Sequence, residues 1–184
     1  MKEISLNILD IAENSVKAKA TLTEIYVDET FDELTLTFKD DGCGMDELTV
    51  KSVIDPFYTT RTTRKVGLGI PLLKLACEQT GGSLTITSSV NEEDHGTTVV
   101  AVFFKNHIDF TPLGDVVSSI ITLIQGHPDT DFLFRHTKED CGEVLLDTRE
   151  LRAVLEEVPL DTYDVICWIR ENLLEQYDDI NKNK

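Results

Sequence analysis

The apolar residues of this chain recur with two different periods, which alternate along its length. Ile4, Ile8 and Ile11 follow the helical period of about 3.6 residues, whereas apolar and polar positions strictly alternate over 33–39. The helical period predicts helices over residues 2–17, from 46 onward, and over 69–80, 113–124, 149–158 and 162–177. The alternating period predicts strands over 21–28, 33–39, 83–90, 97–104, 131–135 and 143–147.

The order of these elements predicts an α+β fold. Up to residue 105 it is typical of a two-layer α/β sandwich, a mostly antiparallel sheet with helices on one face. We expect residues 1–105 to form this domain and residues 106–184 to form a small α+β C-terminal extension. The extension either packs on the first domain or serves as a partner-docking module, with the apolar helix 113–124 as its surface and Trp168 and Tyr177 as anchors.

Composition narrows the classes of partner. The net charge of −17 over 184 residues argues against binding to nucleic acid or to a membrane surface, because both reward clustered Lys and Arg. The four cysteines include no C-x-x-C pair, which favours reduced thiols in a cytosolic protein. No apolar stretch approaches 18 residues and no leader opens the chain, so we expect a soluble, cytoplasmic protein whose oligomeric state stays open.

An acidic turn follows the predicted strand 33–39. Asp40 and Asp41 precede Gly42 and Gly44, two glycines that let the backbone turn with positive φ and approach a ligand closely. A carboxylate fixed at the end of this strand could accept a hydrogen bond from an exocyclic amine. An ordinary hairpin turn has the same local pattern, so the turn alone does not decide between the two.

The first predicted helix carries a polar stripe. Asp10 and Asn14 are four residues apart and share one face, which Lys17 extends. The carbonyl oxygen of Asn14 is a suitable Mg²⁺ ligand when phosphates complete the coordination shell. Asp10 is placed to polarise a water, and Lys17 to offset phosphate charge. A solvated helix face is the alternative for this stripe taken alone.

A basic loop leads into the predicted helix 69–80. Arg61, Arg64 and Lys65 lie within five residues, and Gly67-Leu68-Gly69 follows directly. Backbone N–H groups at a glycine-rich helix N-terminus form an anion site. The spacing fits neither a P-loop nor a dinucleotide-binding fingerprint.

Five segments, in order, resemble the motifs of the GHKL superfamily, which comprises histidine kinases, anti-sigma-factor kinases, mismatch-repair ATPases, type II topoisomerase ATPases and heat-shock chaperone ATPases. Residues 10–17 resemble its N-box and residues 40–44 its D-x-G-x-G box. Residues 56–60 are similar to the F-box of histidine kinases, 66–70 to the end of their lid motif, and 96–98 to the last glycine box. The resemblance covers about residues 1–105 and is nearest to histidine kinase and anti-sigma-factor kinase catalytic domains.

The resemblance implies the Bergerat ATP-binding fold, with ATP and Mg²⁺ as cofactors. It implies that Asn14 holds the Mg²⁺, that Lys17 faces a phosphate and that Asp40 accepts from the adenine N6 amine. The remaining implied nucleotide-binding positions are Gly42, Gly44, Arg61, Lys65, Gly67, Leu68, Gly69 and Thr98.

The chain also departs from the superfamily pattern. Lys65 and Val66 stand where the lid motif has glycine and threonine, and Asp10 stands where the ATPases usually have Glu. Because Met1 is only nine residues before Asp10, we expect no phosphoacceptor hairpin ahead of the N-box. All the histidines lie downstream and are expected to be turn or surface residues: His95, His107, His127 and His136.

Three functions stay open at this point. The first is a histidine kinase-like regulator that binds a partner protein and phosphorylates or controls it. The second is a slow ATPase whose lid acts as a clamp, with Asp10 as the catalytic base; Glu13-Asn14-Ser15 also resembles the mismatch-repair box. The third is a non-catalytic module that senses ATP.

Overall fold

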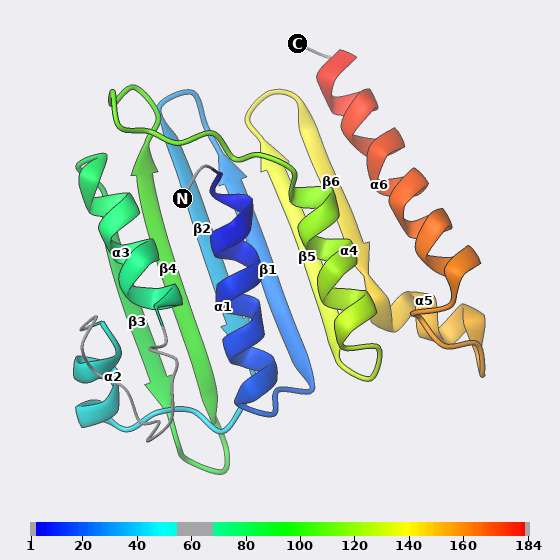
Figure 1. Cartoon of the computed structure of the whole chain (residues 1–184), viewed down its shortest axis with the longest axis horizontal. Helices are drawn as coiled ribbons and strands as arrows, with labels where there is room; N and C mark the ends of the chain where they lie inside the picture. The colour runs from blue at the N-terminus through cyan, green and yellow to red at the C-terminus, as the bar shows by residue number, and fades with distance from the viewer. Residues whose placement is uncertain (1–2, 55–67, 183–184) are drawn as a thin grey trace.

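The computed structural model describes residues 3–54 and 68–182, and within them the chain forms one mixed sheet with helices packed against it (Figure 1). The helices are α1 (Ser5–Lys17), α2 (Glu47–Val53), α3 (Gly69–Gln79), α4 (Val116–Gly126), α5 (Thr148–Leu155) and α6 (Tyr163–Lys182). The strands are β1 (Leu22–Glu29), β2 (Glu33–Asp40), β3 (Ser83–Ser89), β4 (Gly96–Phe104), β5 (Asp131–Lys138) and β6 (Gly142–Asp147). The two periods in the sequence therefore predicted each of these elements to within a few residues.

The six described strands lie in the order β3-β4-β2-β1-β5-β6. All neighbouring pairs are antiparallel except β1 and β5, which run parallel in a register that pairs Leu22 with Asp131. The α+β fold expected from the sequence is confirmed. The single parallel pair requires the long connection through β2, β3, β4 and α4 that separates β1 from β5 in the chain.

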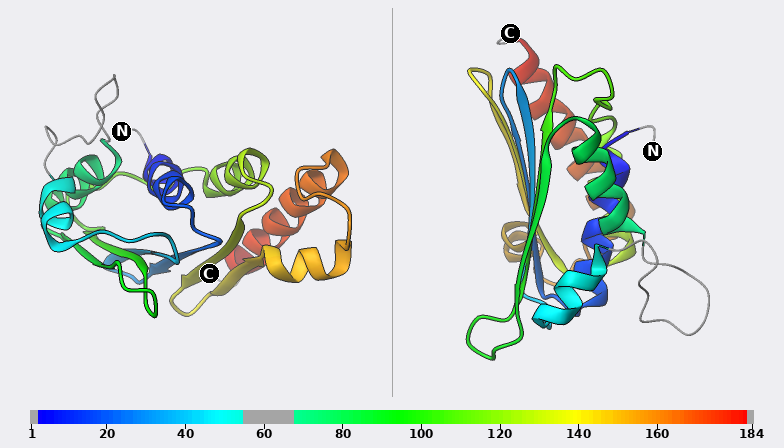
Figure 2. Two further views of the ribbon diagram at one scale, coloured as in Figure 1. Left: turned by 90° about the horizontal axis from the view of Figure 1, so that it is seen from below. Right: turned by 90° about the vertical axis from the view of Figure 1, so that its left-hand side faces the viewer.

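Helices α1, α3 and α4 lie side by side over one face of the sheet (Figures 1 and 2). Alternate residues of the strands point toward them, so that β1 buries Ile25 and Val27 while β2 buries Leu36 and Phe38. On the helix side, α1 contributes Ile8, which is also fully buried. This apolar layer holds α1 in place, and α1 carries the polar stripe on its other side.

Residues after 105 extend the same sheet. Strand β5 pairs with β1, and α4 packs on α1 while α6 packs on β6 and α4. The side-chain amide of Gln176 on α6 accepts from the Leu145 backbone N–H (2.8 Å) and donates to the Leu145 carbonyl oxygen (3.1 Å). A helix side chain thus satisfies part of the edge of β6, which would otherwise be free to pair with another strand.

Two hypotheses about the extension need correction. The apolar residues of α4 are buried in the core and provide no docking surface: Val116, Val117, Ile120, Ile121 and Ile124. Tyr177 is no exposed anchor either, because its hydroxyl oxygen lies 2.8 Å from His136 Nδ1 and burial raises its pKa. Trp168 is half exposed. Helical period alone could not say which neighbour α4 would pack against.

His136 is an internal residue rather than a surface one. Its ring is almost fully buried on β5, between Tyr177 of α6 and Glu29 of β1, whose Oε2 lies 3.2 Å from His136 Nε2. Glu29 also accepts from Lys105 Nζ (2.9 Å). Hydrogen bonding from His136, with help from Lys105 and against the effect of burial, lowers the pKa of Glu29 to about 2. The cluster ties the extension to the central strand of the sheet.

None of the helices in the stretches 3–54 and 68–182 is long and apolar enough to cross a bilayer.

Candidate functional site

The carboxylate of Asp40 is held at the end of β2 by three donors from separate parts of the chain. Its Oδ1 accepts from the Gly42 N–H (3.0 Å) and the Thr97 N–H (3.2 Å), and its Oδ2 accepts from the Ser15 hydroxyl (2.7 Å). Ser15 is buried on α1. Because a carboxylate offers about four lone-pair directions, Asp40 keeps acceptor capacity for one more donor in a fixed orientation.

The neighbouring Asp41 has a different task. Its Oδ1 accepts from the backbone N–H groups of Thr21 (2.7 Å) and Leu22 (2.9 Å), and its Oδ2 from the Thr21 hydroxyl. Burial acts to raise the pKa of Asp41, but the hydrogen bonds from Leu22 and Thr21 hold this pKa below its usual value. Asp41 therefore fixes the start of β1, and Asp40 is the carboxylate turned toward α1.

The turn after Asp40 is possible only with glycine at two positions. Gly44 has a φ of +68°, and a Cβ there would lie 1.7 Å from the Ser89 carbonyl oxygen. A Cβ on Gly42 would lie 2.8 Å from Ala18 Cβ and 3.0 Å from Asp40 Oδ1. The backbone of this turn is thereby pressed against both the end of α1 and the β3–β4 hairpin, which explains the D-x-G-x-G spacing.

The polar stripe of α1 faces the start of α3. A Cβ on Gly69 would lie 3.4 Å from Asp10 Cβ and 3.5 Å from Asn14 Nδ2, so the two helices approach closely at this glycine. Asp10 and Asn14 both remain accessible to solvent. Burial, opposed by Lys17 and reinforced by Glu13, raises the pKa of Asp10 above its usual value. A carboxylate with a raised pKa is a better proton acceptor, which suits a general base.

The N-terminus of α3 lies beside this stripe. Leu68 precedes the helix and is exposed, and no side chain among the described residues caps the helix there. Pro71 contributes no N–H, and within the described stretch that begins at residue 68 the Leu72 N–H is the first that bonds back, to the Leu68 carbonyl oxygen (2.9 Å). The first amide groups and the helix dipole together favour an anion beside Asn14.

Lys17 lies at the end of α1 with its side chain about half exposed. Its Nζ lies 3.5 Å from Glu13 Oε2, one turn earlier, and Glu13 Oε1 lies 2.6 Å from His127 Nε2. Lys17 is therefore near the stripe but paired on the helix surface.

Not all of the predicted positions come together. Thr98 lies on the opposite face of β4 from Asp40, because Asp40 pairs with Thr97 and side chains alternate along a strand. Arg61, Lys65 and Gly67 lie outside the described residues, as does the F-box at 56–60. Sequence reasoning missed the roles of Ser15 and Thr97, since both depend on the register of β2 against β4 and on the packing of α1.

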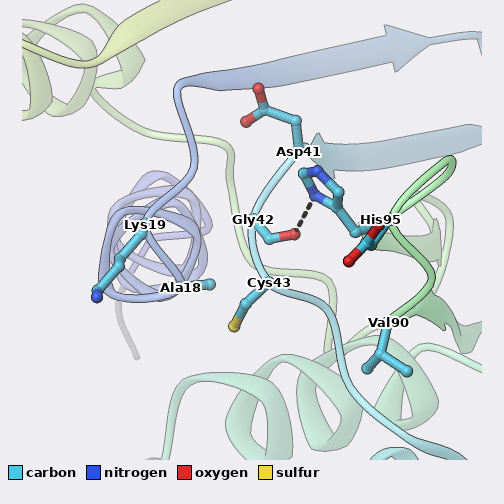
Figure 3. Close-up of a pocket in the computed structure, with 8 residues that line it drawn as sticks. Ala18, Lys19, Asp41, Gly42, Cys43, Val90 and His95 are labelled. Atoms are coloured by element: carbon cyan, nitrogen blue, oxygen red, sulfur yellow. Dashed lines mark hydrogen bonds between the residues drawn. The ribbon is translucent and has the colours of Figure 1, made fainter.

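Beside the same turn the structure has an open pocket of about 340 Å³ (Figure 3). It is lined by Ala18, Lys19, Asp41, Gly42, Cys43, Val90, Glu92 and His95. His95 Nδ1 lies 2.9 Å from the Gly42 carbonyl oxygen and so links the β3–β4 hairpin to the turn. Neither Asp40 nor Asn14 lines this pocket, which lies beside Ala18 at the end of α1. No cluster of His, Cys, Asp and Glu suited to a metal ion occurs in the part of the chain that the structure describes.

Similarity to known proteins fits this arrangement. The model of the family "Histidine kinase-, DNA gyrase B-, and HSP90-like ATPase" matches residues 2–108. A putative sensor protein of Shewanella frigidimarina is 30% identical over 100 residues, 52% of this chain and 15% of that protein. Sensor histidine kinase YvrG of Bacillus subtilis is 30% identical over 98 residues, 50% of this chain and 16% of that protein. The chain thus spans only about a sixth of these curated relatives.

Two solved structures share the fold over most of the chain. The N-terminal domain of a DNA repair protein aligns with a TM-score of 0.57 and 15% identity, covering 80% of this chain and 53% of that one. The Aquifex aeolicus MutL ATPase domain complexed with ADP aligns with a TM-score of 0.55 and 14% identity, covering 85% and 70%. The resemblance read from the five motifs is confirmed.

Proposed function

Since the chain belongs to the family of histidine kinase-, DNA gyrase B- and HSP90-like ATPases, we propose that it binds ATP with Mg²⁺ and phosphorylates or controls a partner protein in the cytoplasm. The observation that carries this proposal is the fixed carboxylate of Asp40, which accepts from Ser15. The residue before Ser15 on α1 is Asn14, which lies beside the start of α3. The site along α1 would thus offer an acceptor for an amine, then an amide oxygen, then an anion site. This is the order in which ATP presents its adenine, its bound metal and its phosphates.

On the adenine side, Asp40 would accept from the N6 amine. Three protein donors already fix the carboxylate, so no side-chain freedom is lost when the base binds. A guanine would present a carbonyl oxygen at the same place and would be repelled. Gly44 and Gly42 would allow the turn to pass close to the base.

On the phosphate side, the amide oxygen of Asn14 would take one position in the Mg²⁺ shell, and the amide groups at Gly69 would face a phosphate. The donor set fits, because both groups are accessible and a neutral amide adds no charge to an acidic surface. Lys17 would supply one positive charge at the end of the helix. Bound ATP supplies a transferable phosphoryl group, and these residues orient it and offset its charge.

The names of the sensor relatives favour the kinase-like function for this chain. A slow ATPase is the second candidate, and the raised pKa of Asp10 beside Asn14 favours it. In that function Asp10 would accept the proton of the attacking water.

A single-turnover reaction with γ-labelled ATP and Mg²⁺ tests the proposal and separates these candidates. We expect the protein to bind ATP with its label intact until a partner is added, and Asn14→Ala to lose the Mg²⁺-dependent part of the affinity. Release of phosphate that disappears in Asp10→Asn, with ATP binding unchanged, would replace the kinase-like function by the ATPase. Absence of any ATP binding would refute both, and binding without turnover in the presence of all candidate partners would leave an ATP sensor.

A further inference from the structure

Helix α4 is fastened to α1 near both ends of their contact. Near the start of α1, the Ser119 hydroxyl donates to the Ser5 carbonyl oxygen (3.0 Å). Near its other end, His127 Nε2 lies 2.6 Å from Glu13 Oε1. His127 directly follows α4 and lies beyond residues 2–108, the part that the family model matches. The contact therefore joins the extension to the helix that carries Asn14.

The carboxylate of Glu13 is shared between two groups. Its Oε1 lies 2.6 Å from His127 Nε2, and its Oε2 lies 3.5 Å from Lys17 Nζ. The side chains of Glu13 and Lys17 are 33% and 53% exposed, so their ion pair is weak and Lys17 can turn toward another anion. Glu13 therefore contacts both the histidine that follows α4 and the lysine at the end of α1.

We propose that His127 is a positioning residue for the phosphate side of the nucleotide site, which engages Glu13 and so leaves Lys17 available to bound phosphates. This inference rests on the proposed function, because it takes Lys17 to act on a nucleotide. Without His127, the whole charge of Glu13 falls on Lys17 and holds it on the helix surface. Without the charge of Glu13, Lys17 is free and His127 has nothing to act through.

The test is a double-mutant cycle on the full chain, with ATP and adenosine titrated by calorimetry. We expect His127→Ala to weaken ATP binding about three- to fivefold, the order of one partly exposed charge contact. Adenosine binding stays unchanged, because adenosine has no phosphate. Glu13→Gln strengthens ATP binding, and adding His127→Ala to it changes nothing further. His127→Gln, whose amide still donates, retains most of the wild-type affinity.

Several outcomes would overturn the inference. Equal losses for ATP and adenosine would mean that His127 only supports the fold, and additive effects in the cycle would mean that it does not act through Glu13. His107→Ala is the matched control, because His107 pairs with Asp109, two residues further along, and not with Glu13. A loss of ATP affinity in His107→Ala as large as in His127→Ala would also refute the inference.

A second measurement keeps the contact and the function apart. Urea unfolding of the four nucleotide-free proteins gives the coupling between His127 and Glu13 directly, and a coupling near zero would overturn the inference whatever the nucleotide does. If the wild type bound no ATP, the proposed function would fail and this inference with it. If the wild type bound ATP and His127→Ala bound it equally well, only the inference would fail.

Discussion

Exchanging Asp40 for Asn changes one atom at the centre of the candidate adenine contact. In the structure, Oδ1 receives two backbone N–H groups, from Gly42 and Thr97, whereas Oδ2 receives only the hydroxyl of Ser15. The carbonyl oxygen of an introduced amide will stay on the two backbone donors. Its NH₂ group then takes the Oδ2 position, where the Ser15 hydroxyl can turn round and accept. The fold is therefore expected to lose only about 1 kcal/mol.

The same substitution should weaken nucleotide binding more than it weakens the fold. An adenine amine that approached Oδ2 would now face another donor. Losing a hydrogen bond to a charged acceptor costs about 1.5–3 kcal/mol, so ATP affinity should fall by roughly 10- to 150-fold. Because guanine carries a carbonyl oxygen at the same place, Asp40→Asn should also narrow or reverse the preference for ATP over GTP. Ser15→Ala, which removes one support but keeps the charge, should give a smaller loss with the preference intact.

The chain offers a chemically identical control one residue away. Asp41→Asn replaces a carboxylate that holds Thr21 and Leu22 and has no place in the proposed adenine contact. We expect it to lower the thermal midpoint without changing ATP affinity, as measured by calorimetry with ATP and GTP on both variants. If Asp41→Asn lost ATP binding while Asp40→Asn kept it, the assignment of the two carboxylates would be wrong.

Two further predictions concern stability. Gly44→Ala should destabilise the fold by about 2 kcal/mol or more, which is roughly 4–8 °C in melting temperature, because φ is +68° and the new Cβ would meet the Ser89 carbonyl at 1.7 Å. Gly126→Ala, where nothing described outside its own helix and its chain neighbours lies within 4 Å of the new Cβ, should melt no lower than the wild type, and equal midpoints for the two variants would contradict the argument. The pKa of Glu29 is about 2 in the folded protein, against an ordinary 4.5, because His136 hydrogen-bonds to it. A carboxylate whose pKa is lower in the folded protein stabilises the fold at any pH above its pKa in the unfolded chain. About 3 kcal/mol of unfolding free energy should therefore be lost as pH falls from about 4.5 toward 2. In Glu29→Gln, the midpoint of urea unfolding should depend less on pH across that range than in the wild type. An equally steep pH dependence in both proteins would refute the pairing of Glu29 with His136.

Local patterns were sufficient for much of the site. Asp10 and Asn14 share a face because the helical period places residues four apart together, and this required no knowledge of the rest of the fold. Gly42 and Gly44 identified a turn that only glycine permits. Long-range pairing could not be read in this way. Thr98 was predicted as a nucleotide-binding position, but the register of β2 against β4 puts Thr97 next to Asp40. A shift of one residue in a strand exchanges its two faces, and a single sequence does not fix that register.

The extension shows the same division. Its helices and strands were readable from their periods, yet their partners were not. The apolar stripe of α4 fits a docking surface as well as a core, and only its packing on α1 decides for the core. His136 was expected at a turn or on the surface but is buried against Glu29, and the contact of His127 with Glu13 was not readable from the sequence.

By itself the sequence determined the elements, their amphipathic faces, the motifs and hence the family, because each of these depends on residues near one another in the chain. The tertiary structure alone showed that Ser15 and the Thr97 N–H hold Asp40 in place, and that residues beyond 105 contact the helix carrying Asn14. Both depend on contacts between segments far apart in the chain. Such contacts are fixed by packing and strand register, which arise only when the whole core forms.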